Sequence, residues 1–268
     1  MPTILALKLV DATEDRQEEL IRNQGQHARA IDHFTKNIGN IETVDQLMDD
    51  PELYAFVMRA YDLEDQIFGK AMMEKILKSN IEEDDALVNK LTDTRFKELY
   101  NGLGFGTDGE GNTNTISATW QEEMVARYVD RQFVNAQSEE NDTLGSILEF
   151  RRKIETIEKP LDILKNETLT EFFQVALGLP KELSGLDIDR QIEILNQKFD
   201  FEDLKDPEEI NRLVVRYAAI KDATEGVSQI ETGATILMQS AVDTSTNLLS
   251  AVIDISTIRN VNTTYWSR

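Results

Sequence analysis

The sequence contains no cysteine, which excludes disulfide bonds, cysteine-ligated zinc and thiol nucleophiles. It contains only two histidines, His27 and His33, and a spacing of six residues places them on different faces of a helix. They cannot chelate one metal ion together, and no residue near either completes a hydrolytic triad or a zinc site. We therefore expect structural histidines, no cofactor, no catalytic residue and no metal ligand.

Basic residues are scarce as well. The chain has 28 Lys and Arg against 50 Asp and Glu, a formal net charge of −22. Such a charge repels phosphate backbones and anionic lipid surfaces, so nucleic acid is not expected as a partner. The apolar run at 4–10 is too short to cross a bilayer, contains Lys8 and lacks the features of a cleaved signal peptide. We expect neither membrane insertion nor a cleaved signal.

The five prolines are widely separated, and between them apolar residues recur at spacings of three and four. A hydrophobic fraction of 40% is sufficient for a packed core. Asp50-Pro51-Glu52 and Asp206-Pro207-Glu208 each combine an N-cap carboxylate with proline at the first helical position, which favours a helix start. The sequence predicts an all-α fold, with helices at 13–38, 51–62, 64–79, 83–91, 94–102, 116–139, 143–158, 167–178, 187–198, 207–222 and 227–258.

An internal repeat is the most informative feature of the sequence. A shift of 116 positions aligns 31–63 with 147–179 without a gap, and most of the identical positions are apolar. The pairs are Ile31/Ile147, Phe34/Phe150, Ile38/Ile154, Ile41/Ile157, Glu42/Glu158, Leu53/Leu169, Phe56/Phe172, Ala60/Ala176 and Leu63/Leu179. We expect two related multi-helix units from a duplication, although two amphipathic helices with a similar turn could resemble each other by composition. The predicted divisions are an N-terminal segment at 1–12, unit one at 13–115, unit two at 116–221 and a long C-terminal helix at 222–268.

A glycine-rich loop at 102–114 separates the two copies. Its Gly-x-Gly-x-x-Gly spacing matches a dinucleotide fingerprint, but a helix is expected before it and Asp108 and Glu110 would repel phosphate. Alternating oxygen donors also resemble a calcium loop, yet Thr113 replaces the turn glycine and Thr119 the closing glutamate. We expect an exposed surface loop, with weak cation binding as the alternative.

Two stretches show the 4-3-4-3 apolar spacing of a coiled-coil seam. The first runs from Leu20 to Ile41. The second, our candidate interaction seam, consists of Leu237, Ala241, Thr244, Leu248, Ala251, Ile255 and Ile258. It could belong to a helix packed on its own domain, to a helix that binds another chain, or to a strand, because Val252, Ile253 and Ile255 are β-branched.

Several segments resemble a bacterial, mainly alphaproteobacterial family of unknown function, number 1217 of the domains of unknown function. The resemblance covers about residues 20–220. It is most specific at Ala176-Leu177-Gly178-Leu179-Pro180 and at Leu186-Asp187-Ile188-Asp189-Arg190-Gln191, and it also includes Asp84–Phe96. The resemblance implies a helical fold and brings no catalytic residues. Its members are often encoded among flagellar genes, so it implies a flagellar context.

Together these features predict a non-enzymatic structural or assembly component associated with the bacterial flagellum, cytoplasmic or flagellum-associated, that acts through helix–helix contacts. Its expected partner is another protein or a second copy, bound through the terminal helices. One alternative is an acidic adaptor or chaperone-like binding protein in the cytoplasm. The other is an enzyme with an unrecognised carboxylate site, which would require a pocket containing carboxyl groups of perturbed pKa.

Overall fold

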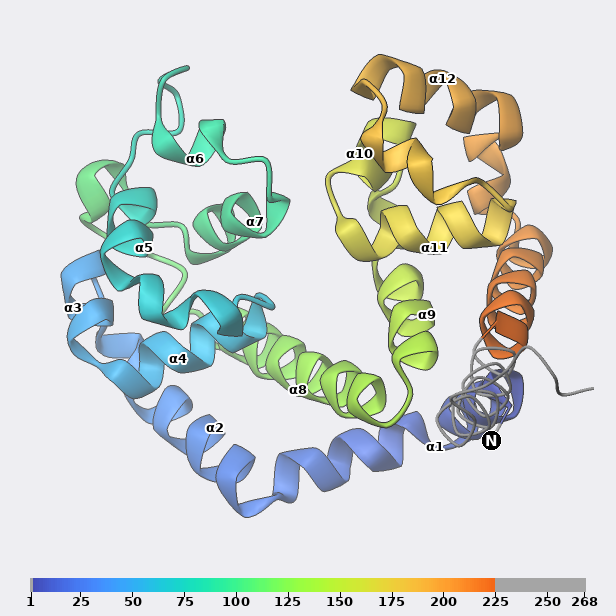
Figure 1. The fold of residues 1–268 in the computed structure, drawn as a ribbon. Coiled ribbons are helices and arrows are strands. Elements are labelled where there is room, and N and C mark those ends of the chain that lie inside the picture. The colour runs from blue at the N-terminus through green and yellow to red at the C-terminus, as the bar shows by residue number, and fades with distance from the viewer. Residues whose placement is uncertain (1, 225–268) are drawn as a thin grey trace, which may run out of the picture. The chain divides into compact units, whose positions relative to one another are not determined.

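The structure, a computed structural model, describes residues 2–224 (Figure 1). The described residues up to Asp222 form one compact unit. The described residues form α-helices and short 3-10 helices without a strand, which confirms the predicted all-α fold. None of the described helices is both long and apolar enough to span a bilayer.

The α-helices are α1 (Thr3–Asn23), α2 (Gly25–Asn37), α3 (Val44–Asp49), α4 (Pro51–Ala60), α5 (Lys70–Leu77), α6 (Leu87–Lys90), α7 (Thr94–Leu103), α8 (Ala118–Glu140), α9 (Asp142–Lys153), α10 (Pro160–Leu164), α11 (Glu167–Leu177), α12 (Ile188–Lys198) and a helix at 207–224. The 3-10 helices are Ile38–Asn40, Glu64–Gly69, Thr107–Gly109, Ile154–Thr156, Lys181–Gly185 and Phe201–Lys205. Both predicted proline helix starts are present. Asp50 Oδ1 accepts from the backbone N–H groups of Glu52 and Leu53, and Asp206 Oδ1 accepts from that of Glu208.

Buried side chains form two clusters, and α8 takes part in both (Figure 1). Its N-terminal half packs with α2 to α7, and Tyr128 stacks on Phe56 at 4.3 Å between ring centroids. Its C-terminal half, from Phe133, packs with α1, α9, α10, α11 and the 207–224 helix. The clusters therefore divide within α8, which differs from the division expected at 115/116. A helix of 23 residues is long enough to serve two cores.

The N-terminal residues are built into the second cluster and do not form a separate segment at 1–12. Ala6, Leu7 and Val10 are buried there. The helix expected at 13–38 instead begins at Thr3 and is interrupted at Gln24, whose backbone is extended with φ −64° and ψ 133°. Helix α2 starts at the next residue in a new direction, so the predicted continuous seam from Leu20 to Ile41 does not form.

The segments related by 116 positions contain the same elements in the same order. In each, an α-helix leads through a 3-10 helix to a short helix and then a longer one, capped by Asp50 or by Asn166. Phe34 stacks on Phe56 at 4.2 Å and Phe150 on Phe172 at 4.1 Å between centroids. The four phenylalanines and Leu63 are buried, whereas Leu179 is half-buried. A duplication as the origin of this likeness stays a prediction.

Candidate functional site

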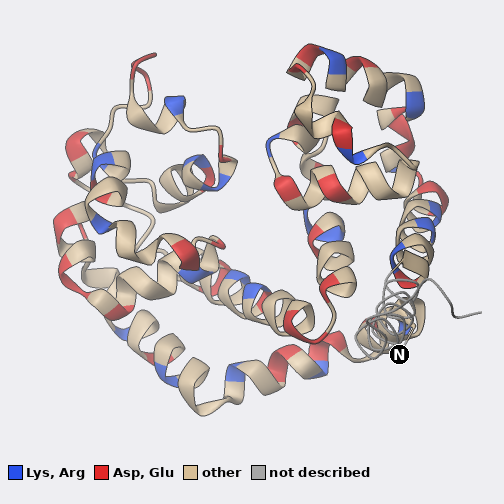
Figure 2. Cartoon of the chain, viewed as in Figure 1, with Lys and Arg blue, Asp and Glu red and all other residues tan. Residues whose placement is uncertain are grey.

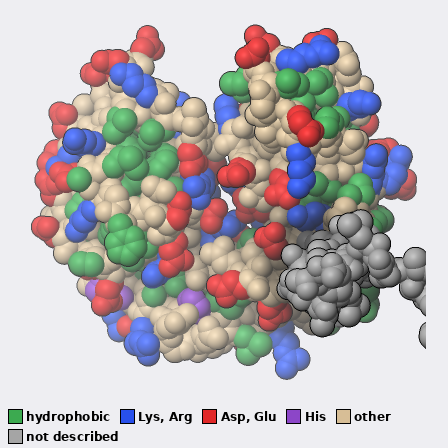
Figure 3. Space-filling view, viewed as in Figure 1, with side chains coloured by type: hydrophobic (Ala, Val, Ile, Leu, Met, Phe, Trp, Pro, Cys, Tyr) green, Lys and Arg blue, Asp and Glu red, His purple; other side chains and the backbone are tan. Residues whose placement is uncertain are grey.

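A charged cleft of about 510 Å³ lies between the two clusters, with α8 as its floor. Figure 3 shows the surface hollowed between α7 on one side and α10 and α11 on the other, with acidic and basic side chains on the walls. The cleft is lined by Asp62, Thr92, Asp93, Arg95, Arg131, Val134, Ser138, Asp142, Gly145, Ser146, Glu149, Lys165, Asn166, Glu167 and Thr168. We call it the central cleft.

Asp62 joins the α7 wall of the cleft to its α8 floor from an unusual backbone position. It follows α4 with φ 57°, in the left-handed region where glycine is usual, and Leu63 N–H donates to the Met58 carbonyl at 2.9 Å. The residue 116 positions later is Gly178, with φ 67° and the same hydrogen-bond pattern. The same turn therefore has glycine in the second segment and a residue with a carboxylate side chain in the first segment. That carboxylate lies 3.0 Å from Arg131 Nη2 and 3.5 Å from Arg95 Nη1.

Arg131 and Glu149 form the most buried ion pair of the cleft. Their side chains are 12% and 8% exposed, and Arg131 Nη1 donates to Glu149 Oε2. Lys153 Nζ reaches the other carboxylate oxygen at 3.1 Å. Because Arg131 also contacts Asp62, one guanidinium on α8 connects the end of α4 to α9. Its Nε is buried and has no hydrogen-bond partner among the described residues.

The electrostatics of the cleft keep Glu149 and Asp93 ionised. Burial alone would raise the pKa of Glu149, but the charges of Arg131 and Lys153 outweigh it, so this pKa lies below its usual value. Burial likewise opposes ionisation of Asp93, and its hydrogen bonds with Arg95 lower its pKa. Carboxylates with lowered pKa hold no proton near neutral pH, so these two residues cannot act as general acids there. The arrangement is suited to connecting helices.

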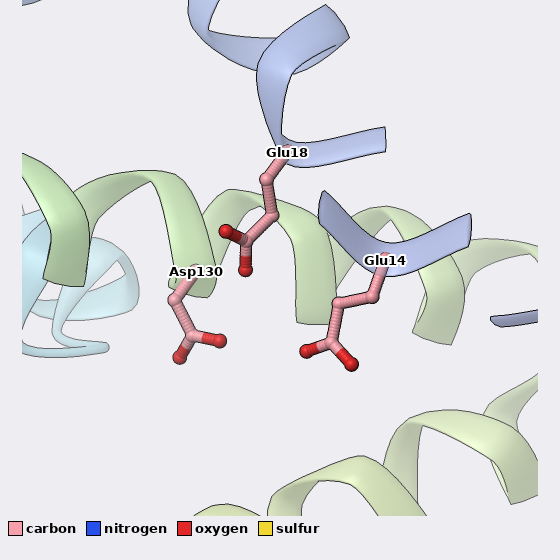
Figure 4. A group of neighbouring side chains, drawn as sticks. All are labelled: Glu14, Glu18 and Asp130. Atoms are coloured by element: carbon pink, nitrogen blue, oxygen red, sulfur yellow. The ribbon is translucent and has the colours of Figure 1, made fainter. Parts of the chain in front are cut away.

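A second carboxyl cluster lies outside this cleft. Glu14 and Glu18 of α1 and Asp130 of α8 turn their carboxyl groups toward one space, with oxygens within 4.8 Å of one another (Figure 4). Burial, followed by the charges of Asp130 and Glu14, raises the pKa of Glu18. Arg152 donates to both Glu14 and Asp130. Figure 2 shows basic and acidic residues interspersed along α8 and α9.

The two histidines occupy separate positions on α2. His27 is buried, and its Nδ1 lies 2.8 Å from the Tyr128 hydroxyl, while His33 Nε2 lies 2.9 Å from Asp50. Burial, with the charge of Arg59, lowers the pKa of His27. Each histidine thus bridges two helices.

The loop at 102–114 is more buried than expected. Leu103, Phe105 and Gly109 are buried, and a Cβ on Gly109 would lie 2.8 Å from Val44 Cγ2. Asn112 uses its amide within the fold, donating to the Leu103 carbonyl and accepting from Asn114 N–H. Most of the other loop residues are exposed, as expected, and the three buried ones enter the fold where Gly109 packs closely against α3.

The predicted interaction seam, from Leu237 to Ile258, lies outside the described residues and stays a prediction. Among the residues of the first predicted seam, which the break at Gln24 interrupts, His27 is buried, and Phe34, Ile38 and Ile41 are buried in the first cluster. Most of that seam is therefore used by the core of this chain. Of the N-terminal seam, Leu20 remains exposed.

Asp62 and Arg131 were not among the residues expected from the sequence to form a site. A single charged residue within a helical pattern cannot be distinguished from a solvated one, and 29% of this chain is charged. One signal was present: position 62 departs from the repeat, since the aligned residue is Gly178. Glycine at the end of a helix pattern indicates a left-handed turn. Aspartate at the matching position of the first segment therefore indicates that its side chain has a role there.

Comparison with known proteins agrees with the helical fold. Residues 60–210 match the family described as a protein of unknown function (DUF1217). Among solved structures, the chain is similar to the crystal structure of protein AGR_C_984 from Agrobacterium tumefaciens, with 26% identity and a TM-score of 0.72. The similarity covers 82% of this chain and 93% of that one. No curated protein matches the sequence.

Proposed function

This chain belongs to DUF1217, a family of proteins of unknown function, and we propose that it is a non-enzymatic structural or assembly component that acts through helix–helix contacts. The flagellar context implied by the sequence resemblance extends the proposal to a component associated with the bacterial flagellum. The partner is another protein or a second copy of the chain.

The exposed leucine face of α1, formed by Leu5, Leu9 and Leu20, supports the proposal. These side chains are 56%, 54% and 62% exposed. Spacings of four and eleven residues place all three on one side of an α-helix, adjacent to the side that carries the buried Ala6, Leu7 and Val10. Burying a leucine fully is worth about 1.5–3 kcal/mol, so a second helix laid along this face would gain a sizeable free energy.

The central cleft favours this role over the enzyme alternative. An acid–base pair requires two groups whose pKa values are shifted apart, whereas those of Glu149 and Asp93 are both lowered by arginines. The adaptor alternative uses the same leucine face with a soluble partner. Assembly and adaptor roles therefore differ in where the protein is found and in what fails when it is lost.

Gene deletion and complementation in the source bacterium test the proposal. We expect the deletion to reduce filament assembly seen by electron microscopy and swimming in soft agar. Wild-type protein should restore both, whereas Leu5→Ser combined with Leu9→Ser and Leu20→Ser should not. The matched control is Phe68→Ser, which also removes an exposed apolar side chain but lies outside α1. Circular dichroism checks that both variants fold.

Two results would count against the proposal. Normal flagella and motility in the deletion strain would remove the flagellar association and favour the adaptor role. Full complementation by the triple serine variant would show that the leucine face of α1 has no role in assembly.

A further inference from the structure

A short exposed segment at the start of α12 has the properties of a second interaction surface. It follows the 3-10 helix Lys181–Gly185, whose Leu183 is buried. Leu186 is extended, and its carbonyl accepts from the buried Gln191 amide at 2.7 Å. The core thus holds the segment in place on both sides without covering it.

Apolar and acidic side chains alternate along this segment. Leu186 is 43% and Ile188 58% exposed, and Asp187 and Asp189 between and after them are exposed as well. All four line one shallow hollow of about 750 Å³ together with Arg190 and Glu193. We call this the 186–193 surface.

The charges of the surface are unbalanced. Arg190 Nη1 pairs with Glu193, which leaves the carboxylates of Asp187 and Asp189 without an ion pair among the described residues. Asp187 occupies the N-cap position of α12, yet its side chain caps no backbone N–H there. Two aliphatic side chains and two free carboxylates therefore face solvent in the same hollow.

We propose that the 186–193 surface binds a basic amphipathic segment of a partner protein. The aliphatic residues of the bound segment cover Leu186 and Ile188, and the Lys or Arg residues of that segment pair with Asp187 and Asp189. A second copy of this chain fits poorly, because its net charge of −22 brings like charge to an acidic surface. This binding site is separate from the leucine face of α1, and it stands whether or not that face takes part in assembly.

The test uses the full-length chain and a synthetic helix-forming peptide of leucine and lysine with one apolar face. A second peptide carries glutamate in place of every lysine. Fluorescence anisotropy measures the dissociation constant of each peptide, at two salt concentrations. We expect the lysine peptide to bind and the glutamate peptide to bind at least about tenfold more weakly.

Paired variants separate a local site from general attraction to an acidic protein. We expect each of two double variants to raise the dissociation constant of the lysine peptide about tenfold. One variant combines Leu186→Ser with Ile188→Ser, and the other combines Asp187→Asn with Asp189→Asn. The charge control is Asp84→Asn with Asp85→Asn, which removes two exposed carboxylates elsewhere and should leave affinity unchanged.

The proposal is overturned if the two asparagine pairs weaken binding equally, because the attraction would then be non-specific. It is also overturned if the serine pair binds as wild type, or if the lysine peptide does not bind at all. Thermal unfolding of each variant verifies that the affinity changes arise in folded protein.

Discussion

Replacing Arg131 by methionine should destabilise the protein through the ion pair that it forms with Glu149. Methionine keeps much of the length of the arginine side chain, so the change removes charge with little loss of packing. It leaves a carboxylate that is only 8% exposed with Lys153 as its remaining ion-pair partner. It also removes the 3.0 Å contact with Asp62.

The expected loss is about 3 kcal/mol in the free energy of unfolding. Removing one member of a buried ion pair costs about 3–5 kcal/mol, because the other charge stays buried. The remaining contact with Lys153, at 3.1 Å, places this case at the low end. Glu149→Gln in the same background should recover part of the loss, because the uncompensated charge is then gone.

Urea unfolding followed by far-ultraviolet circular dichroism measures these free energies for the wild type, both single variants and the double variant. The pH dependence has a defined sign. With Arg131 removed, burial raises the pKa of Glu149, so the folded variant takes up a proton as the pH falls and its deficit becomes smaller. A deficit below about 1 kcal/mol, or strict additivity of the two substitutions, would refute this account of the cleft.

Two further substitutions test other parts of the same framework. Asp62→Gly removes the strain of a left-handed aspartate backbone, which should stabilise the fold by about 1 kcal/mol. It also removes the contacts with Arg131 and Arg95, so we expect no net gain in the free energy of unfolding measured in urea. A more stable glycine variant would show that the carboxylate contributes little. His27 has a pKa below its unfolded value, so stability is complete above about pH 6.5 and declines as the pH falls below it. His27→Gln should reduce that decline between about pH 7.5 and pH 5.5, and an unchanged slope would rule out His27 as its source.

Local rules in the sequence predicted the fold class and several elements. Helix periodicity between widely spaced prolines indicated an all-α chain, and the structure confirms it. The capping pattern at Asp50 predicted the start of α4, because a carboxylate before proline satisfies the first free N–H groups of a helix. Apolar identities at a spacing of 116 include Phe34/Phe150 and Phe56/Phe172, and all four side chains are buried.

Element boundaries were less predictable where weak local preferences competed with packing. The apolar periodicity continues through Gln24, so the sequence indicated one helix where the chain turns. The break lets α2 pack Phe34 into the first cluster and bring His27 next to Tyr128, while Leu7 and Val10 of α1 enter the second. The turn at Gln24 thus separates a helix that packs in one cluster from a helix that packs in the other.

What the sequence determined by itself is what depends on neighbours along the chain: helix type, helix starts, a core face that recurs 116 residues later, and the strong acidic charge. The tertiary structure alone decided which charges meet. Arg131 lies on α8, Asp62 lies 69 residues before Arg131 and Glu149 lies 18 residues after it, and no local pattern relates the three. Their pairing, and with it the lowered pKa of Glu149, arises because folding brings distant carboxylates to one partly desolvated guanidinium.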